Sequence, residues 1–348
     1  MQSPIITALC SYGMSGKVFH APLLHYHQGF QLHGVYERSA DNARLDYLGI
    51  TRYTSLEDML ADEAIELVVV NTPNSSHYEY TKKALQANKH VVVEKPFVAT
   101  VAQANEINEL AFANGKKLAV YHNRRYDSDF LTVKKIIEEK RIGDVVEAEF
   151  HFDRFKQEIS PKQHKETPGD ATGIVYDLGS HIIDQALYLF GMPEAVFADI
   201  FIMRPISKVD DYFEILLYYP GKRVRLKGGY QVKHPVPSFI VHGTLGSFLK
   251  ERADVQEANL QAGLYKGPEG WGAEPASAKG ILNTIADGKE TLQQVETLTG
   301  NYTLFYDKIF EAIRNDAPVP VSAEEGKNVI AIIEAAFKSS NERRVITL

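Results

Sequence analysis

The sequence has few of the features that would indicate an exported, membrane-bound or nucleic-acid-binding protein. Cys10 is the one cysteine in 348 residues, so a disulfide within the chain is impossible. The formal net charge is −7, and lysine and arginine form no block longer than two or three residues. No window reaches the roughly 18 apolar residues that a membrane helix needs. We therefore expect a cytoplasmic protein that binds neither nucleic acid nor a membrane surface.

The length and the order of apolar runs predict two α/β domains. A chain of 348 residues is longer than one hydrophobic core usually serves. Up to residue 122, continuous apolar runs alternate with helical patterns, as in a doubly wound parallel sheet covered on both faces. The predicted strands are Ile5–Cys10, Phe30–Tyr36, Ile65–Val70, His90–Val93 and Leu118–Tyr121, and the predicted helices are Ser55–Ala61, His77–Ala87 and Val101–Ala113. We assign residues 1–122 to a Rossmann domain that binds NAD(P).

Residues 123–348 predict a second α/β domain with an open, mainly antiparallel sheet. Its strands partly alternate between apolar and polar residues, which is typical of a sheet with one free face. The predicted strands are 145–153, 213–219, 224–230 and 238–242, with Pro220-Gly221 as a hairpin turn, and the predicted closing helices are 302–314 and 323–339. Residues 263–280, rich in glycine and proline, predict a loop. A second subunit would cover the free face, so we expect a homodimer or homotetramer.

A glycine-bearing segment follows the first strand, where a Rossmann domain holds the pyrophosphate of its dinucleotide. The pattern Ser11-x-Gly13-x-x-Gly16 keeps the second and third glycines of G-x-G-x-x-G and has serine for the first. An ordinary turn between a strand and a helix is the alternative. After the second strand, Glu37 would accept bonds from a ribose diol, as in NAD sites, whereas Arg38 and Ser39 would hold the 2′-phosphate of NADP.

Two further groups of residues carry possible chemistry. Lys95, in Glu94-Lys95-Pro96, follows a buried strand and so would face a ligand crevice, although it would also fit a surface turn. Asp177 and His181 lie one helical turn apart, which suits a general base oriented by a carboxylate. A helix-capping aspartate with a half-buried histidine is the alternative, and a metal site would need Asp184 as a third ligand.

These motifs together resemble the Gfo/Idh/MocA family of oxidoreductases. In order along the chain they are the glycine loop at 13, Thr72-Pro73-Asn74 with His77, Glu94-Lys95-Pro96, Asn123-Arg124-Arg125, and Asp177 with His181. The resemblance is greatest to the NADP-dependent scyllo-inositol 2-dehydrogenases of that family. It implies an NADP-dependent dehydrogenase, with NAD as a possible cofactor and a small polyol or sugar as substrate.

The resemblance also implies roles for particular residues. His181 would be the base, Asp177 would pair with it and bind substrate, and Lys95 would bind a substrate hydroxyl and assist proton movement. Asn123 and Arg124 would border nicotinamide and substrate, and the peptide before Pro96 is a plausible cis bond. The remaining cofactor-binding candidates are Tyr12, Gly13, Met14, Ser15, Gly16, Glu37, Arg38, Ser39, Thr72, Pro73, Asn74, His77, Glu94 and Lys95. No metal is required. A non-catalytic, dinucleotide-binding redox sensor of the same fold is the alternative.

Overall fold

The computed structural model describes residues 2–161, 163–267, 269–286 and 288–348, and the chain divides into two compact units. The first unit contains Met1–Asn123, Val255–Trp271 and Asn301–Lys327, and the second contains Arg124–Asp254, Gly272–Gly300 and Asn328–Leu348. The first unit therefore includes two segments that come after residue 122 in the sequence. None of the helices in the described ranges is both long enough and apolar enough to cross a membrane.

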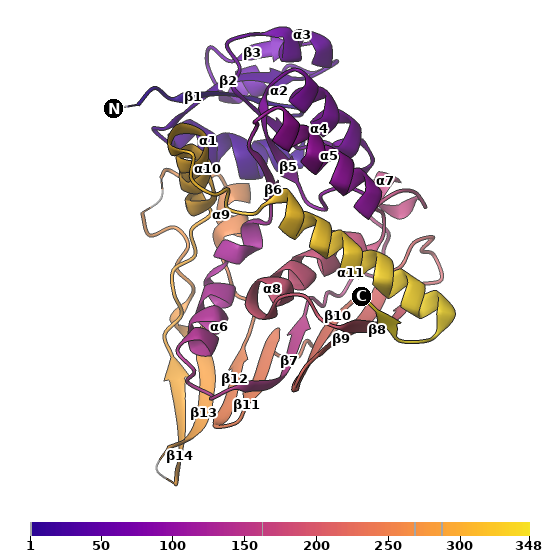
Figure 1. Cartoon of the computed structure of the whole chain (residues 1–348). Coiled ribbons are helices and arrows are strands. Elements are labelled where there is room, and N and C mark those ends of the chain that lie inside the picture. The colour runs from indigo at the N-terminus through magenta and orange to yellow at the C-terminus, as the bar shows by residue number, and fades with distance from the viewer. Residues whose placement is uncertain (1, 162, 268, 287) are drawn as a thin grey trace. The chain divides into compact units, whose positions relative to one another are not determined.

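The first unit is built on a six-stranded parallel sheet of the predicted doubly wound kind (Figure 1). The strand order is β3-β2-β1-β4-β5-β6, so the direction of winding reverses between β1 and β4. The strands are β1 Ile5–Leu9, β2 Phe30–Tyr36, β3 Thr51–Tyr53, β4 Leu67–Val70, β5 His90–Glu94 and β6 Leu118–Tyr121. All four residues of β4 are buried, as expected for a central parallel strand with helices on both faces.

Two helices of the first unit, α3 and α5, begin at residues whose side chains cap them. Ser55 accepts a hydrogen bond from the Asp58 amide at the start of α3, and Thr100 accepts one from the Gln103 amide at the start of α5. The α-helices are α1 Ala21–Tyr26, α2 Asn42–Asp46, α3 Leu56–Ala61, α4 His77–Gln86, α5 Val101–Ala113, α9 Gln256–Gln261 and α10 Thr303–Asn315. Shorter turns are the π-helix η1 Gly16–His20 and the 3-10 helices η2 Asn74–Ser76 and η3 Asn123–Tyr126, the last of which runs into the second unit.

The second unit contains a nine-stranded mixed sheet in which one pair of neighbours, β7 and β10, is parallel and the other pairs are antiparallel. This is the mainly antiparallel sheet that the sequence predicts. In spatial order the strands are β14 Lys289–Val295, β13 Gly280–Ala286, β12 Gly246–Lys250, β11 Phe239–Gly243, β7 Val145–His151, β10 Lys222–Gly229, β9 Tyr212–Tyr219, β8 Ala195–Phe201 and β15 Ile346–Thr347.

One face of this sheet is buried under helices, and the other is partly open. Phe213, Ile215 and Leu217 of β9 are fully buried, whereas the residues between them are half-exposed. Helix α6 packs on β12 and α8 packs on β10. The helices are α6 Ser128–Glu138, α7 Gln163–Glu166, η4 Val175–Gly179, α8 Ser180–Phe190, η5 Ala276–Ala278 and α11 Ala323–Glu342, whose first five residues belong to the first unit.

The Gly263–Gly280 segment is largely the loop that the sequence predicts, although it includes η5 and ends on the first residue of β13. Its Pro268 lies outside the described residues.

Candidate active site

Ser11 and Asn71 hold two loops together at the carboxyl ends of β1 and β4, where the winding of the first sheet reverses. Asn71 donates to the Ser11 carbonyl at 2.8 Å and accepts from the Ser11 amide at 3.0 Å, and the Ser11 hydroxyl donates to the Asn71 carbonyl at 3.1 Å. The same hydroxyl accepts from the Gly13 amide at 3.3 Å. Serine in place of the first motif glycine therefore fixes the glycine loop at the point where open α/β sheets bind ligands.

Gly16 opens η1 and lies in a space that admits no side chain. A Cβ atom at this position would overlap the Ser11 carbonyl oxygen and would come within 2.7 Å of the Asn71 amide nitrogen. This close approach of helix to strand is the physical role of the third glycine of a dinucleotide loop. The loop residues thus fit a dinucleotide.

The structure distinguishes Glu37 from Arg38 at the end of β2. The Glu37 carboxylate is buried and accepts from the amides of Asn42 and Ala43, at 3.3 and 3.0 Å, at the start of α2. Arg38 and Ser39 are both exposed. The two neighbouring side chains are thus in different environments, and the donors that would suit a 2′-phosphate lie on the solvent side.

His77 links the loop after β4 to the end of β5. Its Nε2 is 2.9 Å from the Thr72 carbonyl, and its Nδ1 is 2.8 Å from the Pro96 carbonyl. Burial lowers the pKa of His77, although both carbonyls act in the opposite direction. The bond between Lys95 and Pro96 is cis, which confirms the prediction for this peptide.

Glu94 is at the centre of a buried polar group beside Lys95. Its Oε1 contacts His20 Nε2 at 3.0 Å and accepts from the Ser15 hydroxyl, while its Oε2 accepts from the Lys95 amide at 3.1 Å. Burial would raise the pKa of Glu94, but the bond and charge of His20, the Ser15 hydroxyl and the Lys95 charge lower it to about 2. Glu94 is therefore ionised at neutral pH.

In the second unit, Asp177 lies in the π-helical turn η4, directly before α8. Both of its carboxylate oxygens accept from Lys165 Nζ at 3.0 Å. Asp177 also acts on Lys156. Burial lowers the pKa of Lys156, and the negative charge of Asp177 partly offsets that effect. Asp177 is thus a carboxylate among lysines, which is a suitable arrangement for binding the hydroxyls of a polar substrate.

His181 is buried near the start of α8 and is packed against Phe152, with ring centroids 6.0 Å apart. The guanidinium groups of Arg124 and Arg252 contact the same Phe152 ring, at 5.2 and 4.2 Å from its centroid. Gln185, one turn after His181, donates to the Arg124 carbonyl at 3.1 Å. His181 and Arg124 are therefore held in one packed group.

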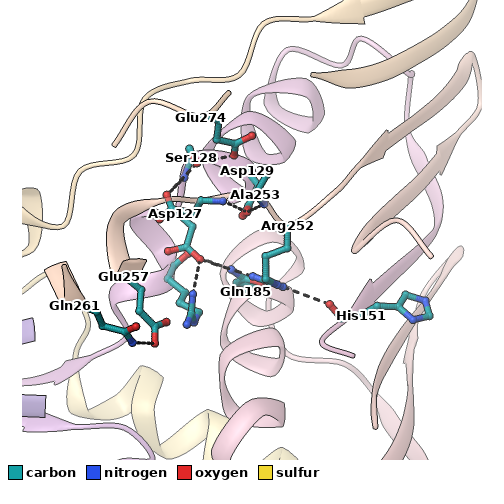
Figure 2. A network of polar contacts seen from close by, with 12 residues as sticks. Asp127, Ser128, Asp129, His151, Gln185, Arg252, Ala253, Glu257, Gln261 and Glu274 are labelled. Carbon is teal, nitrogen blue, oxygen red and sulfur yellow. Dashed lines mark hydrogen bonds and ion pairs between the residues drawn. The ribbon is translucent and has the colours of Figure 1, made fainter. Parts of the chain in front are cut away.

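A polar network fixes the start of α6, just after Arg124 (Figure 2). The Asp129 carboxylate accepts from the amides of Ala253 and Asp254, and the Asp254 carboxylate accepts from the amide and hydroxyl of Ser128. Asp127 pairs with Arg124 at 3.2 Å and with Arg252 at 3.7 Å. Burial raises the pKa of Asp127 to about 8, although Arg124 acts against it. Asp127 is thus part of a buried network rather than a simple helix cap.

Asp184, the third ligand of the metal alternative, pairs instead with Arg125. The two hydrogen bonds are 2.8 and 2.6 Å long and both partners are buried. Within the described ranges, no group of three or more His, Cys, Asp or Glu side chains is arranged to hold a metal ion.

Each unit thus brings together its own share of the predicted site. The glycine loop, Glu37 to Ser39, Thr72 to His77, Glu94, Lys95 and Asn123 belong to the first unit, and Arg124, Asp177 and His181 belong to the second. Convergence of Lys95 with Asp177 and His181 stays a prediction.

Three residues of these polar groups were not predicted from the sequence: His20, Asn71 and Lys165. Asn71 directly precedes a predicted motif, which was a usable indication, whereas nothing in the sequence distinguishes His20 or Lys165 from surface residues.

Comparison with known proteins finds one family that matches both parts of the chain. Residues 6–122 match the model of the NAD-binding Rossmann fold of the Gfo/Idh/MocA oxidoreductase family, and residues 134–348 match the model of its C-terminal α/β domain. The chain is 41% identical to scyllo-inositol 2-dehydrogenase (NADP(+)) IolW of Bacillus subtilis, over 99% of this chain and 96% of that protein. It is 36% identical to the oxidoreductase YdgJ of Escherichia coli over the whole of both chains.

Solved structures are similar over the same length. The oxidoreductase YvaA from Bacillus subtilis is 41% identical and superposes with a TM-score of 0.95 over 99% of both chains. An oxidoreductase from Bacteroides fragilis is 42% identical, with a TM-score of 0.91 over 99% of this chain and 100% of that one. The chain belongs to the Gfo/Idh/MocA family of oxidoreductases.

Proposed function

We propose that this oxidoreductase transfers hydride between NADP and a secondary hydroxyl or ketone of a cyclitol or sugar, with a scyllo-inositol-like compound as substrate. The full-length similarity to an NADP-dependent scyllo-inositol 2-dehydrogenase carries the proposal. The presence of Lys95, Asp177 and His181 supports it, because alcohol oxidation needs a proton acceptor and a nearby positive charge.

In this proposal, three side chains have separate roles in the reaction. His181 takes the hydroxyl proton, while the bound nicotinamide supplies the acceptor for the hydride. Lys95 binds the reacting hydroxyl and stabilises negative charge on its oxygen. Asp177 binds a neighbouring hydroxyl, for which it must share or release its contact with Lys165. Lys165 also reduces the cost of holding the Asp177 charge before substrate arrives.

We assign the adenosine 2′-phosphate to Arg38 and Ser39. Arginine presents a planar set of donors that matches a phosphate dianion, and Arg38 is exposed at the end of β2. Glu37 would repel the dianion if its carboxylate faced the ribose, but that carboxylate binds the first amides of α2. The environment of Glu37 therefore favours NADP, although NAD stays possible.

A substrate panel tests the proposed function. The protein is mixed with NADPH and a series of inososes and ketosugars, and with NADP and the corresponding alcohols, while the absorbance of the reduced cofactor is followed. We expect turnover with at least one cyclitol or sugar. NADPH binding without turnover of any compound would favour the alternative, a dinucleotide-binding redox sensor.

A further inference from the structure

His20 lies outside every predicted motif, yet it makes two hydrogen-bond contacts in the interior of the first unit. Its Nδ1 is 2.7 Å from the Tyr306 hydroxyl, and its Nε2 is 3.0 Å from Glu94 Oε1. Both His20 and Tyr306 are completely buried. The ring also packs on Tyr121, with centroids 4.4 Å apart. A histidine held at both nitrogens beside a carboxylate can stabilise the charge of that carboxylate as well as pack in the interior.

His20 is also the last residue of the π-helical turn that begins at Gly16. Single π-helical turns occur frequently at functional sites, because they reposition side chains relative to an ordinary α-helix. This turn places His20 against Glu94, a residue 74 positions further along the chain. The end of η1, the turn that follows the glycine loop, is thus in contact with the residue before Lys95.

The negative charge of Glu94 determines the direction of the hydrogen bond between His20 and Glu94. An ionised carboxylate only accepts hydrogen bonds, so His20 Nε2 donates to it, as do the Ser15 hydroxyl and the Lys95 amide. A protonated Glu94 would carry a hydrogen on one oxygen and would be a weaker acceptor for these three donors. Burial favours that protonated state, and the hydrogen bond of His20 is the largest influence opposing it.

We propose that His20 is a positioning residue for the reaction: its hydrogen bond to Glu94 lets that carboxylate hold the Lys95 amide and the Ser15 hydroxyl together. His20 thereby fixes the catalytic lysine and the glycine loop relative to each other within one unit. Tyr306 acts from α10 by fixing the His20 ring. This inference rests on the proposed function, since it concerns how Lys95 is held for that chemistry.

Two substitutions of His20 separate hydrogen bonding from packing. His20→Gln keeps an N–H donor at the end of the side chain, whereas His20→Met has similar length and no donor. We expect His20→Met to lower kcat by at least about tenfold, because a displacement of about 1 Å at a reacting group can cost on the order of 100-fold. His20→Gln should recover most of the loss.

The matched control is His33→Met. His33 forms another histidine–carboxylate contact in the first unit, with Asp62 at 3.2 Å, and it belongs to no part of the proposed site. Its kcat should stay near that of the wild type.

The pH dependence of kcat gives a readout that a merely structural role would not change. The titratable groups that face Glu94 are His20, His77, Lys95 and Tyr306. In the wild type, the pKa of Glu94 is about 2, far below neutrality, so Glu94 should add no acid limb near neutral pH. Loss of the His20 donor destabilises the charged carboxylate and raises its pKa. The acid limb of kcat should therefore move to higher pH in His20→Met and, less strongly, in Tyr306→Phe.

The possible results of these experiments can be told apart. Trp271, the one tryptophan of the chain, lies in the first unit, and we expect NADPH binding to quench its fluorescence through energy transfer to the reduced nicotinamide. A wild type that binds NADPH and turns over no substrate would overturn the proposed function and this inference with it. An active wild type with unchanged kcat and acid limb in folded His20→Met, or equal impairment in His20→Gln, would overturn this inference alone. If His20→Met does not fold, an unchanged acid limb in Tyr306→Phe has the same meaning.

Discussion

At the scale of single residues, the environment of His181 suits a base better than a surface histidine. The ring is buried, and it is packed on Phe152 in a group that also contains Arg124 and Arg252. A base held by packing keeps its position when substrate binds, and so it needs little reorganisation during proton transfer.

We expect His181→Ala to lower kcat by a factor on the order of 100 or more, since positioned general bases contribute about 100- to 10,000-fold. The dissociation constant for NADPH should change little, because the substitution removes an interaction with the reacting hydroxyl and not with the cofactor. Steady-state kinetics and Trp271 fluorescence measure the two quantities. His234→Ala, at an exposed position of the same unit, is the control. Near-normal turnover in His181→Ala would remove His181 from the mechanism.

Arg38 gives the prediction on cofactor choice. Charge-assisted hydrogen bonds are worth about 1.5–3 kcal/mol each, which corresponds to a preference of about tenfold or more. Arg38→Ala should therefore raise the Michaelis constant for NADP and leave that for NAD almost unchanged, whereas the exposed control Arg343→Ala should change neither. Equal loss with both cofactors, or a wild type that prefers NAD, would mean that the assignment to Arg38 is wrong.

The candidate residues came from short motifs, whereas their partners came only from the structure. Lys95, Asp177 and His181 became candidates because Lys95 follows a predicted strand and the other two are spaced one helical turn apart. The contact of His20 with Glu94 joins residues 74 positions apart, and no local pattern encodes it. Lys165 lies in a short helix within a polar segment, where its sequence resembles that of any solvated loop.

At the scale of secondary-structure elements, the glycine loop and η1 depend on the small volume of Gly16. An alanine Cβ would overlap the Ser11 carbonyl oxygen. Because backbone rather than a flexible side chain occupies that space, the loop or η1 must move.

We expect Gly16→Ala to lower the free energy of unfolding by about 1–3 kcal/mol, the usual cost of overpacking, and to weaken NADPH binding. Urea unfolding and Trp271 fluorescence provide the measurements. Gly169→Ala is the matched control, because the nearest atom to an added Cβ there is 3.9 Å away. A stable Gly16→Ala protein with normal NADPH affinity would contradict this account of the loop.

Long apolar runs and capped helices were predictable, and short or irregular elements were not. Helix α5 has the predicted bounds, and so do β2 and β6. The three-residue strand β3 and the short helices α1 and α2 are stabilised by contacts with the rest of the unit, as the bond of Glu37 to the α2 amides illustrates. In the second unit, β8 and the strands β12 to β15 were missed, although only β14 and β15 are at the edges of the sheet. Strand propensity depends on the neighbours that a strand packs against, so these short segments have weak patterns in the sequence alone.

At the scale of the whole molecule, the open face of the second sheet presents apolar groups on either side of a charged centre. Paired positions run across the sheet from β13 to β8, and the ion pair between Glu149 and Arg225 lies in the middle of the row. The members of the row in spatial order are Ile281, Leu249, Ile240, Glu149, Arg225, Leu216 and Phe197. Ile281 is 45% exposed and Phe197 is 39% exposed.

An apolar surface of this kind on a sheet face suits an interface between copies of the chain. In a twofold-symmetric interface the same face serves both partners, so each substitution acts twice. We therefore propose that the protein is a homodimer or homotetramer in which this face is covered.

Light scattering at micromolar concentration should report a dimer or tetramer for the wild type. Ile281→Glu should shift the population toward monomer, because two carboxylates would lose water in an apolar part of the interface. Leu48→Glu changes a leucine that is 100% exposed in the first unit, so it should leave the assembly intact. A monomeric wild type would refute the interface. If Leu48→Glu dissociates as much as Ile281→Glu, the added charge alone would explain the dissociation, and the sheet face would not be the interface.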